Sequence, residues 1–320
     1  MDPPARIDCL QFTKPSRALF QEMRGGEVDA VHITVSYHEG FRETVAGLAE
    51  WNRLFEEHGD LILRGLWADD IDHARATGRT AIFFGAQNPA PLEDDLGLVE
   101  ILHQLGLRFM QLSYNNQSLL CSGCYEREDT GLTNMGREVV SEMNRVGLVI
   151  DMSHSGDRSR REAIERSARP IAITHANPSE WHDVPRNVRP ETLAALAKRG
   201  GMLGFSLYPL HLKDGSACTL ESFTEMVART AEAVGTAALG IGSDLCQGQD
   251  DSALAWMRDG RWKKARSGAA FPAQPAFFAT NRDFPALSEG LRARGFDTSE
   301  THAIMGGNWY RFFKESFAAK

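Results

Sequence analysis

The sequence has few cysteines, no surplus of basic residues and no long apolar run, and each absence excludes a class of protein. Five cysteines in 320 residues form an odd and sparse set, which favours a reducing compartment over a disulfide framework. The formal net charge is -8, so a nucleic acid is not expected as a partner. No stretch reaches the roughly 18 consecutive apolar residues that a membrane span needs, so no membrane partner is expected either.

Residues 1–16 contain early prolines and no apolar segment of the kind that secretory signals carry. No internal repeat and no low-complexity segment interrupts the chain. We therefore expect a cytoplasmic globular protein whose partner is a small-molecule substrate.

The sequence does contain a regular alternation of short apolar runs and amphipathic stretches. We predict strands at residues 7–10, 28–35, 80–85, 108–112, 147–152, 170–174, 202–206 and 239–243. Most of these runs are apolar on both faces, as in a parallel sheet that is covered by helices. Helical patterns lie between them, at residues 96–105, 137–146, 158–166, 190–199 and 222–234.

Eight strands with intervening helices predict one (β/α)8 (TIM) barrel domain over residues 1–320. The alternative is an open doubly wound sheet, for which eight strands are many and a glycine-rich phosphate loop is missing. A polar segment at 114–134 and an insertion at 247–283 both follow strand ends, where barrel active sites are built. The insertion is rich in aromatic residues, which predicts a lid or a contact between two copies in a homodimer.

Polar residues close three of the predicted strands. His154 follows the fifth strand, His175 the sixth and Asp244 the eighth. Imidazole nitrogen and carboxylate oxygen suit a zinc ion that activates water. One histidine at a strand end is more often structural, but three such residues at one end of a barrel indicate a site.

The segment 131–154, which ends in Asp151-Met-Ser-His154, resembles the hallmark segment of the membrane (renal) dipeptidases, peptidase family M19. Further similarities are Thr174-His175, Pro185-Arg186-Asn187, and the segments 240–244 and 305–309. The resemblance implies a (β/α)8 barrel with a two-zinc site that hydrolyses dipeptides, including those with a C-terminal D-residue. At the matching positions it implies that His154 and His175 hold the second zinc, that Arg186 and Asn187 bind substrate, and that Asp244 handles protons.

Several family positions are altered in this chain. The family's first strand carries Asp-Gly-His-x-Asp, and its two metal-binding positions fall on Leu10 and Phe12, which cannot donate to a metal. The glutamate that bridges both ions falls on Gln87, a neutral amide that bridges two cations poorly. The histidine that contacts substrate after the fourth strand falls on Tyr114. The chain thus resembles a divergent branch that lacks the first-strand zinc ligands.

Two residues could replace the missing ligands. His32 lies within the second predicted strand and could point into the barrel, and Cys246 follows Asp244 by two residues. A structural histidine and a buried apolar cysteine are the more common interpretations of such positions.

Two functions therefore remain open. In the first, the protein hydrolyses an amide bond in a dipeptide or N-acyl amino acid with one zinc, which His154 and His175 bind together with Gln87 or Asp244. Asp244 would transfer the proton and Arg186 would hold the substrate carboxylate. In the second, a metal-poor homologue binds a small molecule or performs non-hydrolytic chemistry in the same pocket.

Overall fold

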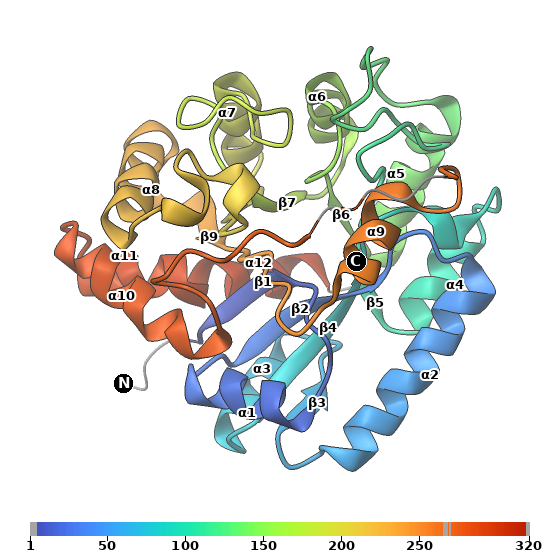
Figure 1. Cartoon of the computed structure of the whole chain (residues 1–320). Helices are drawn as coiled ribbons and strands as arrows, with labels where there is room; N and C mark the ends of the chain where they lie inside the picture. Colours follow the sequence, from blue (N-terminus) through green and yellow to red (C-terminus); the bar gives the residue numbers. More distant parts are fainter. Residues whose placement is uncertain (1–4, 265–267, 269, 318–320) are drawn as a thin grey trace.

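The computed structural model describes residues 5–264, 268 and 270–317. Its strands surround a central axis and its helices lie outside them (Figure 1). The strands are β1 (Ile7–Gln11), β2 (Ala30–Ser36), β3 (Ile62–Arg64), β4 (Thr80–Ala86), β5 (Leu107–Gln111), β6 (Val149–Asp151), β7 (Ala172–Ala176), β8 (Met202–Phe205) and β9 (Leu239–Ile241).

All strand pairs are parallel and eight of the strands close a ring. Strand β1 pairs with both β2 and β9, β2 pairs with β4, and the strands from β4 to β9 continue in chain order. The closed barrel predicted from the sequence is confirmed, and the open sheet is excluded. Strand β3, which was not predicted, pairs with the first half of β4, from Ile62 opposite Thr80 to Arg64 opposite Ile82.

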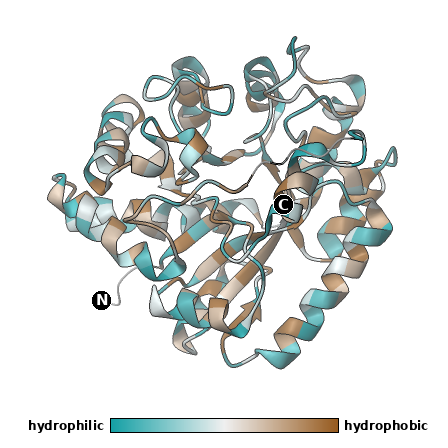
Figure 2. Ribbon diagram, viewed as in Figure 1, coloured by the Kyte–Doolittle hydropathy of each residue, from teal (hydrophilic) through white to brown (hydrophobic). Residues whose placement is uncertain are grey.

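The helices are α1 (Arg17–Gly25), α2 (Phe41–Glu57), α3 (Asp69–Ala76), α4 (Leu98–Gln104), α5 (Asn134–Val146), α6 (Asp157–Arg166), α7 (Pro190–Lys198), α8 (Leu220–Val234), α9 (Asp251–Asp259), α10 (Phe284–Ala293), α11 (Thr298–His302) and α12 (Asn308–Ser316). Hydrophobic and hydrophilic residues alternate along the outer helices, as expected for elements with one buried face (Figure 2). Within the described part of the chain, no helix has both the length and the apolar character that a membrane span needs.

Local signals at α5 position the strand that carries the first histidine. The Thr133 side chain accepts a hydrogen bond from the backbone of Gly136 and caps the start of the helix. Gly147 ends it with a φ of 83°, a left-handed conformation that glycine adopts without strain. The chain then enters β6, which ends at Asp151, three positions before His154.

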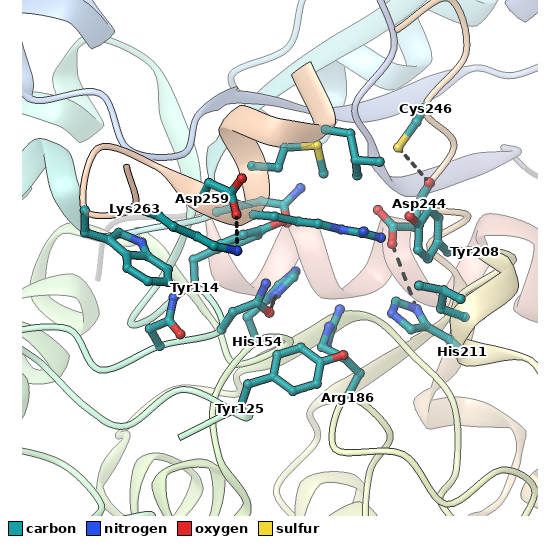
Figure 3. Close-up of a pocket in the computed structure, with 18 residues that line it drawn as sticks. Tyr114, Tyr125, His154, Arg186, Tyr208, His211, Asp244, Cys246, Asp259 and Lys263 are labelled. Carbon is teal, nitrogen blue, oxygen red and sulfur yellow. Dashed lines mark hydrogen bonds and ion pairs between the residues drawn. The ribbon is translucent and has the colours of Figure 1, made fainter. Parts of the chain in front are cut away.

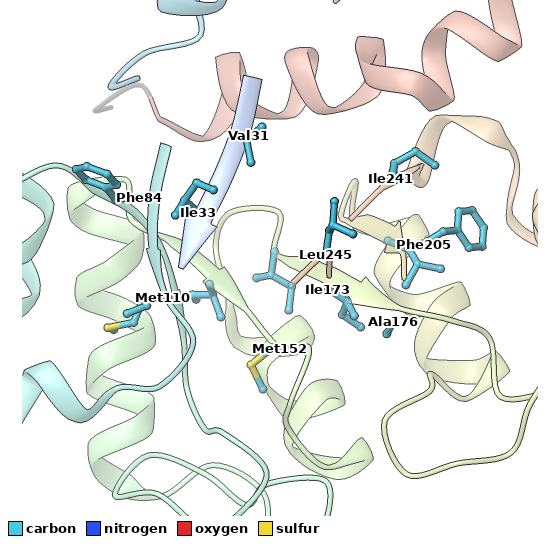
Figure 4. Close-up of a cluster of buried hydrophobic side chains, with 14 of the residues drawn as sticks. Val31, Ile33, Phe84, Met110, Met152, Ile173, Ala176, Phe205, Ile241 and Leu245 are labelled. Carbon is cyan, nitrogen blue, oxygen red and sulfur yellow. The ribbon is translucent and has the colours of Figure 1, made fainter. Parts of the chain in front are cut away.

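The core has two layers. Small and aromatic side chains fill the barrel interior, and Trp309 and Phe313 of α12 pack against them at the end where the strands begin. Aliphatic side chains on the outer faces of the strands, such as Ile33, Ile173 and Ile241, fill the space beneath the helices (Figure 4). The end of the barrel at which the strands finish is left for loops, and polar side chains gather there.

Candidate active site

A cavity of about 520 Å³ opens at the carboxyl ends of the strands (Figure 3). Five of the seven predicted site residues line it: Gln87, Tyr114, His154, Arg186 and Asp244. They follow four different strands, β4, β5, β6 and β9, and the loop after β7. The structure therefore brings together residues that lie up to 157 positions apart in the sequence, from Gln87 to Asp244.

The two predicted zinc-binding histidines face each other through their Nε2 atoms, which lie 3.0 Å apart. The Asn115 Oδ1 atom lies 2.7 Å from His154 Nδ1. On the other ring, Nδ1 of His175 lies 2.8 Å from the Thr174 hydroxyl, which itself donates to Asp151 at 2.6 Å. Both Nδ1 atoms therefore carry the proton, and both Nε2 atoms present lone pairs to the same point.

The two rings are neutral as well as aligned. Burial, followed by the positive charge of Arg186, holds the pKa of His154 well below its usual value. The same two causes lower the pKa of His175. A shared proton between the rings is thus disfavoured, while a metal ion would satisfy both lone pairs, so this donor pair fits one cation.

The two sequence positions at which the family binds its first metal ion carry apolar side chains in this structure. Leu10 is fully buried, and Phe12 packs edge-on against Tyr37 with ring centroids 4.8 Å apart. Among the described residues, no group of three or more histidine, cysteine, aspartate or glutamate side chains could hold a metal. A further ligand for an ion at the histidine pair would have to be an amide, a backbone oxygen or water.

Gln87 and Tyr114 line the cavity together with His154. The Gln87 amide nitrogen donates to Thr34 at 2.8 Å and to the Tyr37 hydroxyl at 2.9 Å. The Tyr114 ring stacks on the His154 ring, with centroids 4.1 Å apart. The tyrosine at this position therefore covers one face of an imidazole and fixes its orientation.

Asp244 is buried, and its backbone φ is 58°, a left-handed conformation that residues other than glycine adopt infrequently. Burial raises the pKa of its carboxyl group to about 7, against the opposing effect of the Arg186 charge. Its Oδ2 atom lies 3.9 Å from His211 Nδ1. A carboxyl group with such a pKa can both accept and return a proton near neutral pH.

Arg186 is buried and forms no ion pair with any residue that the structure describes. It donates instead to the backbone oxygens of Ser153 and, at 3.0 Å, His175. A buried guanidinium without a counter-ion is costly unless a ligand supplies the negative charge. This arrangement points to an anionic group on whatever binds in the cavity.

Asn187, predicted to bind substrate, does not line the cavity. Its amide nitrogen donates to the backbone oxygens of His182, at 2.8 Å, and His211, at 3.1 Å. Its amide oxygen accepts from the backbone of Asn177 at 3.0 Å. In this structure Asn187 holds the backbone that carries His211.

The two replacement candidates have different surroundings. The His32 ring stacks on Phe109 inside the barrel, at 4.3 Å, and its Nδ1 atom lies 2.9 Å from the Cys9 backbone oxygen. His32 is thus a structural residue rather than a cavity residue. Cys246 does line the cavity, but burial and the nearby Asp244 raise the pKa of its thiol, which opposes metal binding.

Several cavity residues were not predicted from the sequence, among them Tyr208 and His211 after β8, and Arg258 on α9. The first two follow the seventh predicted strand and could have been found by the strand-end rule that found the histidine pair. Residues of α9 and the segment after it line the cavity from above, so the described part of the insertion covers the active face as predicted for a lid. Its Trp256 side chain donates to Glu39 at 2.7 Å, which ties it to the segment after β2.

A barrel with paired imidazoles, a carboxyl group and an unpaired guanidinium at the carboxyl ends of its strands has the features of a metal-dependent hydrolase. The model of the membrane dipeptidase family, peptidase family M19, matches residues 10–255. The chain therefore belongs to this family, and the resemblance found in the sequence is confirmed.

Curated and solved relatives agree with this membership. Dipeptidase tcpJ of Claviceps purpurea is 26% identical over 290 residues, which are 90% of this chain and 62% of that protein. The chain spans 46% to 62% of the length of the first curated relatives that it matches. The crystal structure of an amidohydrolase from Pseudomonas aeruginosa is 36% identical, with a TM-score of 0.94 over 98% of this chain and 97% of that one.

A metallo peptidase from Rhodobacter sphaeroides, solved with a phosphinate mimic of the dipeptide L-Ala-D-Ala, shares the fold. It has a TM-score of 0.82 at 17% identity and covers 98% of this chain and 100% of its own.

Proposed function

We propose that this protein is a dipeptidase-like hydrolase that cleaves the amide bond of a small carboxylate-bearing substrate, a dipeptide or an N-acyl amino acid, with one zinc ion. The observation that carries the proposal is the pair of Nε2 atoms of His154 and His175, 3.0 Å apart and beside an unpaired guanidinium. Membership of the M19 family and the dipeptide mimic bound by the Rhodobacter relative support it.

His154 and His175 would hold the ion, and Asn115 and Thr174 would keep both rings in the tautomer that metal binding requires. When bound, zinc lowers the pKa of water to about 7 and polarises a carbonyl group. Gln87 remains the candidate for a further ligand, because the hydrogen bonds described for it are made by its amide nitrogen. The site would hold one ion only, because Leu10 and Phe12 offer no donor atom for a second ion.

Arg186 would bind the substrate carboxylate, because a guanidinium holds a carboxylate through two parallel hydrogen bonds. Its bonds to the backbone of Ser153 and His175 fix it relative to the histidine pair. Asp244 would accept the proton of the attacking water in its ionised form and then return it to the leaving amine. A pKa of about 7 makes both steps accessible at neutral pH.

The alternative, a metal-poor homologue, is favoured by one observation: no group of three charged or imidazole ligands is found among the described residues. Such a protein would bind an anionic molecule through Arg186 without cleaving it.

Hydrolysis of a panel of dipeptides and N-acetyl amino acids by zinc-loaded protein separates the two functions. Amino acid release should be lost in His175→Ala. It should be kept in His302→Ala, because His302 lies on α11 and does not line the cavity. Circular dichroism and thermal unfolding should show that both variants fold. Hydrolysis that survives in His175→Ala, or no hydrolysis of any panel member by the wild-type protein, would contradict the proposal.

A further inference from the structure

Three positively charged side chains line the active-site cavity: Arg186, Arg258 and Lys263. Lys263 is already paired with Asp259, at 3.1 Å. Arg258, like Arg186, forms no ion pair within the described part of the chain. Two guanidinium groups therefore line one cavity without a carboxylate within ion-pair distance among the described residues, and the roles assigned above use only one of them.

The two arginines come from different parts of the fold. Arg186 follows β7 at the rim of the barrel, whereas Arg258 lies in the last turn of α9 in the lid. Burial raises the pKa of the Tyr125 hydroxyl group, and the positive charges of Arg186 and Arg258 partly offset this rise. The Arg258 guanidinium also lies beside the Tyr208 hydroxyl, and Tyr208 in turn lies near Asp244. Asp244, Tyr125 and Tyr208 line the same cavity as the two arginines.

Contacts to the segment after β2 hold the lid in place. His38 Nε2 lies 3.1 Å from the backbone oxygen of Met257, the residue directly before Arg258. Trp256, two residues before Arg258, donates through Nε1 to Glu39 at 2.7 Å. The turn of α9 that carries Arg258 is therefore held against the segment after β2, and the half-buried Arg258 side chain is positioned at the cavity. A preorganised cation without a counter-ion is the usual form of an anion-binding group.

We propose that Arg258 binds a second anionic group of the substrate, so that the preferred substrates are dipeptides or N-acyl amino acids with an acidic side chain. This inference rests on the proposed function, because Arg186 is taken to hold the main-chain carboxylate. The amide bond would then lie between the two anchored carboxylates, near Asp244. Lys263 contributes less to this recognition, because Asp259 already neutralises it.

The test compares substrates that differ in one charge. L-Ala-D-Glu and L-Glu-D-Ala are each set against the corresponding glutamine dipeptide, which has the same shape without the charge. A charge-assisted hydrogen bond in a partly buried site corresponds to a preference of about 10- to 100-fold in kcat/KM. We expect this preference for at least one of the two glutamate dipeptides, and we expect Arg258→Gln to remove it while activity on the glutamine dipeptides stays within about threefold.

Arg261→Gln is the matched control, because it removes an arginine from the same segment whose charge is already paired and which does not line the cavity. It should keep the preference for glutamate. Equilibrium binding of the same dipeptides to Asp244→Asn, measured by calorimetry, gives a second readout that does not depend on turnover. Equal kcat/KM for glutamate and glutamine dipeptides, or a preference that survives in Arg258→Gln, would overturn the inference and leave the proposed function intact. Absence of hydrolysis of all four dipeptides, with binding retained, would instead contradict the proposed function.

Discussion

Replacing Asn115 by glycine should weaken metal binding at the histidine pair without touching either ligand. The Asn115 Oδ1 atom, 2.7 Å from His154 Nδ1, fixes the proton on that nitrogen and leaves Nε2 free for a cation. Loss of such a partner lowers metal affinity by about 10- to 100-fold, or about 1.4 to 2.7 kcal/mol. Glycine is the right substitution because Asn115 has a φ of 63°, which alanine would adopt only with strain.

The assay is competition for zinc between the protein and a chromophoric chelator of known affinity. Asn115→Asp is the matched control: it keeps an acceptor oxygen and tolerates the left-handed backbone, so it should bind zinc at least as tightly as the wild type. Asn116→Gly controls for the loss of a neighbouring asparagine side chain that lines the cavity. If Asn115→Gly binds zinc as tightly as Asn115→Asp, the tautomer reasoning is wrong.

Three further predictions concern the proton-handling residue and the barrel interior. Asp244→Asn should lower kcat by about 10²- to 10⁴-fold with little change in KM, because an amide cannot accept the proton; steady-state kinetics measures this. In the wild type, kcat/KM should fall as the pH drops below about 7, where the Asp244 carboxyl group becomes protonated, and a pH profile that stays flat from pH 5 to 8 would exclude this role. Gly85→Ala should destabilise the fold by about 1 to 3 kcal/mol in urea unfolding, because the new Cβ would lie 1.8 Å from His32 Nε2, whereas Gly268→Ala, with open space around it, should not.

The barrel was predictable because parallel strands covered by helices are apolar on both faces, and eight such runs stand out in the sequence. Strand β3 was not predicted; it lies outside the ring of eight strands, and its place is set by pairing with Thr80 and its neighbours, which the sequence alone does not show. The histidine pair was predictable for a related reason: polar residues that end buried strands of one barrel must converge.

The partners of these residues were not predictable in the same way. Asn115 lies 39 positions from His154, and only the folded loop after β5 brings its side chain to the ring. Asn187 was assigned to the substrate by resemblance, but the backbone of His182 and His211 uses its amide nitrogen. Arg258 lies in a segment whose aromatic residues predicted a lid, and nothing local distinguishes it from an exposed helical arginine.

Zinc content per chain distinguishes a one-ion site from a two-ion or a metal-free site. Protein purified without chelators, saturated with zinc and freed of excess metal should contain one ion per chain by mass spectrometry of the metal. His154→Ala should contain none, because it removes one of the two facing lone pairs, and Leu10→Ala should still contain one, because no ion lies beside that residue. Two ions in the wild type, or one ion that persists in His154→Ala, would contradict a single zinc site at the histidine pair.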